Sequence, residues 1–421
     1  MKMSSYFQIF PGKNGEPAVA LHSRTGASFA FSEEMYGRLQ TFIKNPNNDG
    51  DPELEDFLIY QDVLIPDKIN ELELIKEKYR RDRKSKEELY VTYSMTNACN
   101  FRCTYCYQEH KAEVLEKENL EKTFLYIERE LPGYERLKVH WFGGEPTLRL
   151  PWIEQSAKRL VDLCNELGKG YFSGITTNGS RFDENTASLL KRCHVNQVQF
   201  TLDGDQELHD LFRISKSGRG TFLIVLNAIK TSVKAGFITF VRVNISPRNY
   251  SRLGKLLDRL QSEEIGPHNI VLYLNEMKQH SNSANNPSMY FSSIEKYGDA
   301  LVESLKILKS YGYPVPRILP VDVNCQFDKP SSVLFGVDGN LYHCTTGTDK
   351  ALAELDNRGS VTKETARRKF VHEREPWDDP TCAKCPNLPT CMGGCAYLDE
   401  EGKVKCNPEG FVIEDILRLA L

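Results

Sequence analysis

The sequence predicts an α/β protein built around a parallel sheet. Apolar or β-branched runs alternate with helical patterns six times between Leu89 and Met277, which is typical of right-handed βαβ units. The chain has 421 residues, more than one ordinary domain, and its composition changes on both sides of this region. We expect a small α+β domain over residues 1–88 and an α/β domain over 89–310, with its sheet open or curled into a barrel. A cysteine-rich domain is expected over 311–421.

The six strands set where chemistry is expected. They are predicted at Leu89–Met95, Lys138–Phe142, Tyr171–Thr176, Gln197–Leu202, Thr239–Ile245 and Ile270–Asn275. In βα barrels the functional loops follow the C-terminal ends of the strands. Five segments should therefore share one mouth: Cys99–Cys106, Gly143–Glu145, Thr177–Gly179, Thr201–Gly204 and the region after Arg242. Arg242 and Asn244 reach this mouth only if their strand turns them inward.

The first 88 residues contain no cysteine and have their own pattern. Val19–Phe31 predicts two short strands around a Thr-Gly turn. Ser32, followed by two glutamates, predicts a helix start. Asn45–Asp51 is predicted to be a loop, and a second helix should run through Leu72 and Ile75.

Twelve cysteines in a chain without a recognisable export signal point to metal binding or catalysis rather than to disulfides. Ten of them cluster, three within Cys99–Cys106 and seven from Cys325 to Cys406, whereas Cys164 and Cys193 are expected in the core. The net charge of −4 argues against a nucleic-acid partner. No apolar stretch reaches the ~20 residues of a membrane span. We therefore expect a cytoplasmic protein without nucleic-acid or membrane partners.

Cys99, Cys103 and Cys106 form the first group of candidate metal ligands. Three thiolates on one loop can hold three corners of a four-iron cluster, which leaves the fourth iron open to an outside ligand. The alternative is a zinc site completed by a histidine such as His110, although zinc motifs usually pair cysteines two by two.

This CxxxCxxC spacing resembles the radical SAM superfamily, and the resemblance extends from Leu89 to Met277. A Gly-Gly-Glu-Pro segment follows the second strand, and Thr201-Leu202-Asp203-Gly204 closes the fourth. The resemblance implies a partial (β/α)6 parallel barrel. It also implies that S-adenosylmethionine (SAM) chelates the open iron and is cleaved reductively to a 5′-deoxyadenosyl radical.

The same resemblance assigns residues to the SAM site. Cys99, Cys103 and Cys106 are the catalytic cluster ligands, and the cofactor-binding positions are Tyr105, Gly143, Gly144, Glu145, Thr177, Asn178, Thr201 and Arg213. Tyr105 corresponds to the aromatic residue near adenine, and the Gly-Gly-Glu segment to the motif that binds the methionine amine. Ordinary Asn-Gly and Asp-Gly turns would explain the glycines but not the downstream His-Asp-x-x-Arg. Asp203 is expected to fix its loop rather than act on substrate.

The tail is similar to a SPASM domain, whose seven-cysteine spacing it follows. This implies two auxiliary iron–sulfur clusters of the 4Fe-4S type, making three in all. The outer one would bind Cys382, Cys385, Cys391 and Cys406, and the inner one Cys325, Cys344 and Cys395. A zinc ribbon would use four cysteines and leave three unexplained. Fully cysteine-ligated relatives place a cysteine where this chain has Ser331, so the inner cluster has an open iron or a ligand such as Asp328.

SPASM enzymes modify peptides and proteins, so the resemblance implies a peptide or protein substrate and an electron donor such as flavodoxin or ferredoxin. A thioether or carbon–carbon cross-link in a ribosomal peptide is the first hypothesis. Sulfatase maturation or a quinone-cofactor pathway is the second, and a non-catalytic scaffold the third. Sulfatase-maturing relatives carry an aspartate where this chain has Thr345. The N-terminal region resembles a leader-peptide-recognition domain, or is a cap on the barrel.

Overall fold

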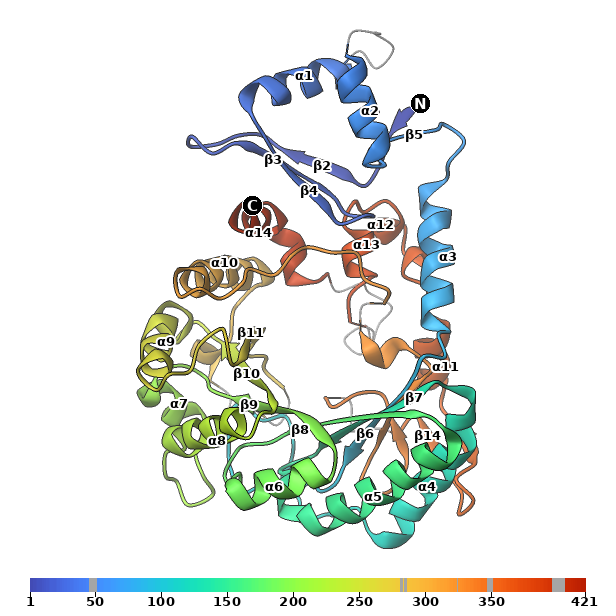
Figure 1. Cartoon of the computed structure of the whole chain (residues 1–421), viewed down its shortest axis with the longest axis vertical. Coiled ribbons are helices and arrows are strands. Elements are labelled where there is room, and N and C mark those ends of the chain that lie inside the picture. The colour runs from blue at the N-terminus through green and yellow to red at the C-terminus, as the bar shows by residue number, and fades with distance from the viewer. Residues whose placement is uncertain (45–50, 281–282, 284–285, 324, 347–350, 396–405) are drawn as a thin grey trace. The chain divides into compact units, whose positions relative to one another are not determined.

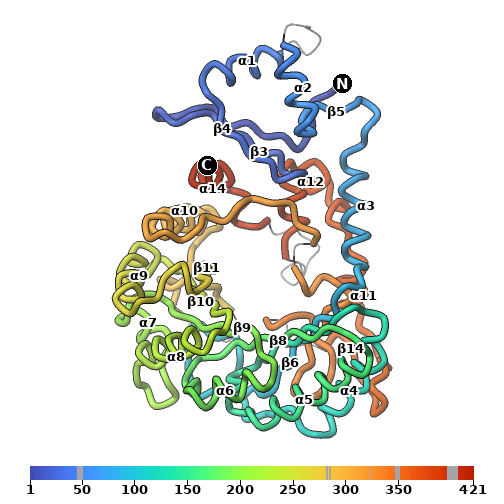
Figure 2. The backbone as a smooth tube through the Cα atoms, viewed as in Figure 1, coloured from blue at the N-terminus to red at the C-terminus, as the bar shows by residue number. Residues whose placement is uncertain are grey.

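The computed structural model describes residues 1–44, 51–280, 283, 286–323, 325–346, 351–395 and 406–421. The chain divides into two compact units. Unit 1 comprises Met1–Lys84, Val315–Lys329 and Glu373–Leu421, and unit 2 comprises Ser85–Pro314 and Pro330–His372. Figures 1 and 2 trace the chain through both. The predicted domain boundaries at residues 88 and 310 stay a prediction.

Unit 2 is built on six parallel strands that neighbour one another in chain order. They are β6 (Glu88–Ser94), β7 (Arg136–Phe142), β8 (Gly170–Thr176), β9 (Val195–Thr201), β10 (Ile238–Ile245) and β11 (Val271–Glu276). The α/β fold with a parallel sheet is therefore confirmed, and each predicted strand lies within two residues of an observed one.

The sheet continues beyond β6 into the C-terminal part of the chain. Strand β12 (Ser332–Phe335) pairs with β6 in parallel. Three short antiparallel strands follow: β13 (Leu341–Tyr342), β14 (Ala353–Leu355) and β15 (Val361–Glu364). Residues 330–372 thus extend the sheet of unit 2.

Helices cover one face of the parallel strands (Figure 1). They are α4 (Lys117–Glu130), α5 (Leu150–Leu167), α6 (Glu184–Arg192), α7 (Gln206–Phe212), α8 (Phe222–Lys234) and α9 (Leu253–Ser262). Helix α10 (Ile294–Ser310) packs on α9, and α11 spans Ala366–Glu373. The covered face is apolar: Trp141 is fully buried and stacks on Tyr93 at 5.4 Å between ring centroids. The Tyr93 hydroxyl hydrogen-bonds the Thr123 hydroxyl of α4 at 3.0 Å. Cys164 and Cys193 are buried, as predicted.

The opposite face of the same strands carries polar, half-buried side chains. His140 on β7 hydrogen-bonds the Thr176 hydroxyl of β8 at 2.9 Å, and the Tyr273 hydroxyl of β11 donates to Gln199 of β9 at 2.8 Å. A cavity of about 330 Å³ opens on this face. Strand alternation therefore separates a helix-covered apolar face from a face that carries half-buried polar side chains.

The N-terminal part of unit 1 is an antiparallel sheet of three strands, β2 (Phe7–Phe10), β3 (Ala18–His22) and β4 (Ala27–Phe31). The hairpin of β3 and β4 confirms the predicted pair of strands; β2 was not predicted. Helix α1 (Glu33–Lys44) follows, with the Ser32 hydroxyl accepting the Met35 N–H at 3.1 Å. The predicted loop at 45–51 lies almost entirely outside the described residues.

Further elements of unit 1 are α2 (Pro52–Tyr60), which was not predicted, and α3 (Glu71–Arg83), which confirms the second predicted helix. The short strands β1 (Lys2–Met3) and β5 (Leu64–Ile65) pair antiparallel. The tail adds α12 (Pro380–Ala383), α13 (Leu388–Cys391) and α14 (Ile413–Ala420). No helix in the described ranges is both long and apolar enough to cross a bilayer.

Strand β3 is buried along its whole length because both faces of the sheet are covered. Ala18 and Ala20 face a core that contains residues of α1 and α2. Val19 and Leu21 face Ile413 and Leu417 of α14. The first and last segments of the chain therefore share one hydrophobic core.

Candidate cluster and cofactor site

The loop after β6 carries the three cysteines predicted to bind a cluster. Its backbone is tied to the segment after α7: Arg102 N donates to Ile214 O at 2.7 Å and Thr104 N to Phe212 O at 2.8 Å. Lys216 N closes the pairing on Asn100 O at 2.8 Å. The loop is therefore fixed by backbone hydrogen bonds that need no particular side chain.

The thiols of Cys99, Cys103 and Cys106 lie within electrostatic range of one another, and each is half-buried. Burial, and then the neighbouring Glu145, raise the pKa of the Cys99 thiol to about 12. Burial and Cys103 raise the pKa of Cys106 to about 11. Metal ligation requires the thiolate, so a bound cationic centre would reverse the preference of these thiols for their neutral form.

Two donors point at the Cys99 sulfur. The Phe101 N–H lies 3.4 Å from it and the Asn178 side-chain amide 3.6 Å. The Asn178 amide also donates to Asn100 Oδ1 at 2.8 Å, which keeps it beside the loop. In iron–sulfur proteins, hydrogen bonds to the ligand sulfurs tune the reduction potential.

The two glycines after β7 face the backbone that leads into the cysteine loop. A Cβ on Gly144 would lie 2.6 Å from the Ala98 carbonyl carbon and 2.8 Å from Asn97 O, with Ala98 O closer still. Gly144 N donates to Thr96 O at 2.7 Å and Glu145 N to Ala98 O at 2.9 Å. A side chain at Gly144 would therefore collide with the backbone of the chain itself, and the part of this segment in SAM binding stays a prediction.

Glu145 is fully buried and joins the ends of β7 and β8. Its carboxylate accepts hydrogen bonds from the Thr147 N–H at 3.0 Å, the Thr147 hydroxyl at 2.6 Å, the Thr177 hydroxyl at 2.7 Å and the Asn178 N–H at 2.6 Å. Burial raises the pKa of the carboxyl, and these four donors oppose the rise. The carboxylate therefore holds Thr177 and Asn178 in place beside Cys99.

Asp203 is the centre of a second buried network. It accepts from the Tyr105 hydroxyl, from the Asn244 N–H at 2.8 Å and from the Asn244 side-chain amide at 2.9 Å. Arg213 lies 3.9 Å from the same carboxylate and donates to the Tyr105 hydroxyl at 2.7 Å. Asp203 therefore links its own loop to β10 and to the cysteine loop, as expected of a residue that fixes the loop.

Strand β10 directs the side chains of Arg242 and Asn244 toward the predicted mouth. The Arg242 side chain donates to Asn244 Oδ1 at 2.8 Å, and Asn244 reaches both Asp203 and the Tyr105 hydroxyl. Arg242 lies opposite Thr201 of β9, which is itself buried. Both β10 side chains therefore belong to the predicted mouth.

Two observations indicate that the residues of this site are suited to hold SAM and an iron–sulfur cluster. Arg213 Nε is buried without a hydrogen-bond partner among the described residues, and such a cation can take an anionic or polar group of a ligand. The three thiols are gathered on one loop beside it, since Arg213 acts on the pKa values of both Cys103 and Cys106. No group of three His, Cys, Asp or Glu side chains arranged for a single metal ion occurs in the part of the chain that the structure describes.

Four tail thiols are also brought together. The pKa of Cys382 is raised to about 12 by burial, by Asp379 and by the thiols of Cys391, Cys385 and Cys406. These four are the predicted ligands of the outer cluster. Of the predicted inner ligands, Cys325 and Cys395 belong to unit 1 and Cys344 to unit 2, and this set stays a prediction.

Sequence reasoning missed the polar inner face of the strands. His140, Gln197, Gln199 and Tyr273 line the 330 Å³ cavity there. The signal was present, because Gln197 and Gln199 alternate with buried apolar residues along β9. Tyr107 was also missed: its ring lies 5.5 Å from that of His280.

A family model of the radical SAM superfamily matches residues 93–260. The chain is 27% identical to the Fe-coproporphyrin III synthase of Methanosarcina barkeri over 237 residues, which covers 56% of each protein. It is 25% identical to the cysteine-type anaerobic sulfatase-maturating enzyme of Clostridium novyi over 334 residues, covering 70% of this chain and 84% of that enzyme.

Two solved structures resemble the fold. The enzyme anSMEcpe with bound AdoMet aligns with a TM-score of 0.61 at 18% identity, covering 79% of this chain and 96% of that one. Streptococcus suis SuiB bound to precursor peptide SuiA aligns with a TM-score of 0.53 at 13% identity, covering 95% and 97%. At these identities the likeness concerns the fold.

Proposed function

We propose that the chain, which matches the radical SAM superfamily over residues 93–260, is an enzyme that cleaves SAM reductively and uses the radical to modify a ribosomally synthesised peptide. One observation carries this proposal: the three thiols of the 99–106 loop meet the Glu145 turn and the buried Arg213 at the C-terminal ends of the strands. When bound, the first cluster supplies the electron for SAM cleavage, and the tail clusters supply an electron acceptor or a substrate anchor.

The chain's own residues would bind the catalytic cluster and SAM and orient them. Cys99, Cys103 and Cys106 would hold the catalytic cluster. Tyr105, Gly143, Gly144, Glu145, Thr177, Asn178, Thr201 and Arg213 would form the SAM site. Glu145 would support the SAM site through Thr177 and Asn178, which its carboxylate holds. Arg213 would offer SAM its Nε–H, which has no hydrogen-bond partner among the described residues. Firm positioning matters because small misplacement of reacting groups lowers rates steeply.

The tail would hold the auxiliary clusters. The gathering of Cys382, Cys385, Cys391 and Cys406 supports a four-cysteine outer cluster. We assign Cys325, Cys344 and Cys395 to the inner cluster, with an open iron or Asp328 in place of a fourth thiolate. An open iron could anchor a substrate thiol, which favours a thioether over a carbon–carbon cross-link.

The substrate we propose is a leader-bearing precursor peptide. SuiB, whose fold covers 95% of this chain, was solved with its precursor peptide. Strands β2 and β4 are the outer strands of the N-terminal sheet, and an extended leader could add to such an edge. We expect the reaction in the cytoplasm, with a flavodoxin or ferredoxin as electron donor.

Sulfatase maturation is the second candidate, and the relative from Clostridium novyi favours it. The residue after Cys344 weighs against it, because Thr345 has no carboxylate. The two activities leave different products: a cross-link removes two hydrogen atoms and keeps the sulfur, whereas conversion of cysteine to formylglycine loses the sulfur. A quinone-cofactor pathway would instead require a quinone-precursor peptide.

The test is anaerobic reconstitution, followed by iron counting and incubation with SAM, a reductant and candidate peptides. We expect 5′-deoxyadenosine, and a peptide from a neighbouring gene that loses two hydrogen atoms by mass spectrometry. Replacing Cys99, Cys103 and Cys106 with alanine should abolish 5′-deoxyadenosine and leave the tail-bound iron. Intact SAM with the iron-loaded wild-type protein would disprove the proposal, and sulfur loss from a sulfatase peptide would establish the second candidate.

A further inference from the structure

Besides packing on α14, the N-terminal sheet reaches the cysteine-rich tail inside unit 1 at the turn Pro386–Asn387. Gln8 of β2 donates from its side-chain amide to Asn387 Oδ1 at 2.8 Å. The Ser23 hydroxyl, just after β3, donates to Pro386 O at 2.5 Å. This turn immediately follows Cys385, a proposed ligand of the outer cluster.

Asn387 connects several parts of the proposed cluster site. Its backbone N–H points at Cys385 Sγ at 3.4 Å, and its carbonyl accepts the Cys391 N–H at 3.1 Å. Its side-chain amide donates to Gly410 O at 3.4 Å, four residues beyond Cys406. Asn387 therefore directs a hydrogen-bond donor at one cysteine and contacts the chain segments that carry two others.

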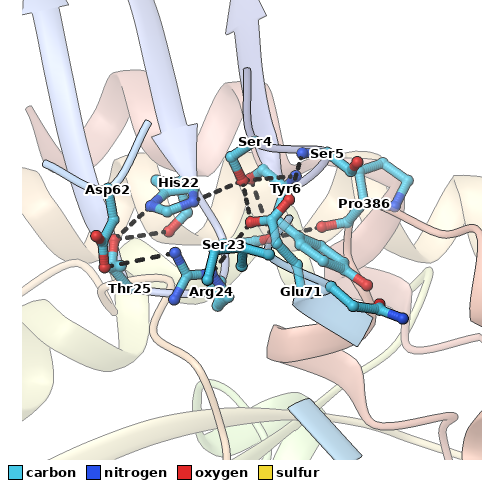
Figure 3. A network of polar contacts seen from close by, with 12 residues as sticks. Ser4, Ser5, Tyr6, His22, Ser23, Arg24, Thr25, Asp62, Glu71 and Pro386 are labelled. Carbon is cyan, nitrogen blue, oxygen red and sulfur yellow. Dashed lines mark hydrogen bonds and ion pairs between the residues drawn. The ribbon is translucent and has the colours of Figure 1, made fainter. Parts of the chain in front are cut away.

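Ser23 is itself held by a buried network, shown in Figure 3. The neighbouring His22 is fully buried and lies 2.9 Å from the Ser4 hydroxyl, which donates to Glu71 Oε1 at 2.6 Å. The Arg24 guanidinium donates to the same Glu71 oxygen at 3.2 Å. Residues 22–24 are thus tied to the first residue of α3.

The hydrogen-bond partners in this network determine which atom of each pair carries the proton. Because Ser4 donates to Glu71, its oxygen must accept from His22 Nε2, and His22 Nδ1 then accepts from the Thr25 hydroxyl at 2.8 Å. A neutral imidazole satisfies all these bonds. The loop that carries Ser23 is therefore held with His22 in its neutral form.

An N–H directed at a ligand sulfur stabilises the extra negative charge of a reduced cluster and raises its reduction potential. We infer that Gln8 and Ser23 are positioning residues for the outer auxiliary cluster, because they hold the turn that aims the Asn387 N–H at the Cys385 sulfur. This inference rests on the proposed function only in requiring that the outer cluster forms.

The test is an EPR-monitored redox titration of the full-length, reconstituted chain with Cys99, Cys103 and Cys106 replaced by alanine, so that only tail clusters contribute. The signal that Cys406→Ala removes is assigned to the outer cluster. In Gln8→Leu and in Ser23→Ala we expect the reduction equilibrium to move about tenfold toward the oxidised form, which is ~59 mV for one electron. Hyperfine coupling to the exchangeable amide deuteron near the cluster should weaken in both.

Matched controls are Gln40→Leu on the exposed face of α1 and Ser28→Ala on β4, which should leave the potential unchanged. If Gln8→Leu fails to fold, Gln8→Met nearly keeps the length of the side chain and removes the donor without adding a charge. An unchanged potential in folded, iron-loaded Gln8 and Ser23 variants would overturn the inference alone. A wild-type tail that takes up no iron would instead refute the outer cluster, and with it that part of the proposed function.

Discussion

Replacing Gly144 with alanine tests whether the glycine turn after β7 and the cysteine loop are as closely apposed as the structure has them. The new Cβ would lie 2.6 Å from the Ala98 carbonyl carbon, whereas ordinary contact begins near 3.4 Å, so the two backbones must separate by about 1 Å. The φ of Gly144 is not left-handed, so the penalty is steric. Separation would stretch the hydrogen bonds to Thr96 O and Ala98 O and shift Cys99, which follows directly.

We expect a loss of about 1–3 kcal/mol of folding free energy, typical of overpacking, and a larger loss of activity. Displacing a reacting group by ~1 Å can cost about 100-fold in rate, so 5′-deoxyadenosine formation should fall by about that factor. The measurements are urea unfolding, iron content and 5′-deoxyadenosine by chromatography. Gly133→Ala is the control, because its Cβ would meet nothing within 4 Å. Wild-type cleavage and iron content in Gly144→Ala would refute the reasoning.

Three other perturbations have defined outcomes. Arg213→Leu leaves the buried Asp203 without its cation and should cost about 3–5 kcal/mol in urea unfolding; unchanged stability would contradict the buried pairing. Asn178→Leu removes a donor 3.6 Å from Cys99 Sγ and should lower the potential of the first cluster in a redox titration, whereas an equal or higher potential would count against that contact. Burial and Arg24 lower the pKa of His22 from 6.5 to about 4, so the unfolded chain binds the extra proton between these pH values. Stability should be complete above pH 6.5 and fall by on the order of 2 kcal/mol as the pH drops to 4, and His22→Gln should remove this dependence in urea unfolding measured against pH.

The sequence alone predicted the order of strands and loops in unit 2. Strand and helix periodicities are local, and parallel βα units place every strand's C-terminal end at one edge. The cysteine loop, the Glu145 turn and the Asp203 segment could thus be placed at one mouth from periodicity and chain order. The cysteines of the tail could also be identified from local information, because the signal is their spacing along the sequence.

Tertiary structure alone decided what those residues touch. Whether Arg242 and Asn244 face inward depends on the register of β10 against its neighbours, which periodicity leaves open. The space beside Gly144 is filled by Ala98, 46 positions earlier in the chain, and Gln8 meets Asn387 across 379 positions. Contacts over such separations depend on how whole elements pack, so no local pattern encodes them. For this reason the chemistry could be read from the sequence, while the residues that position it emerged only from the fold.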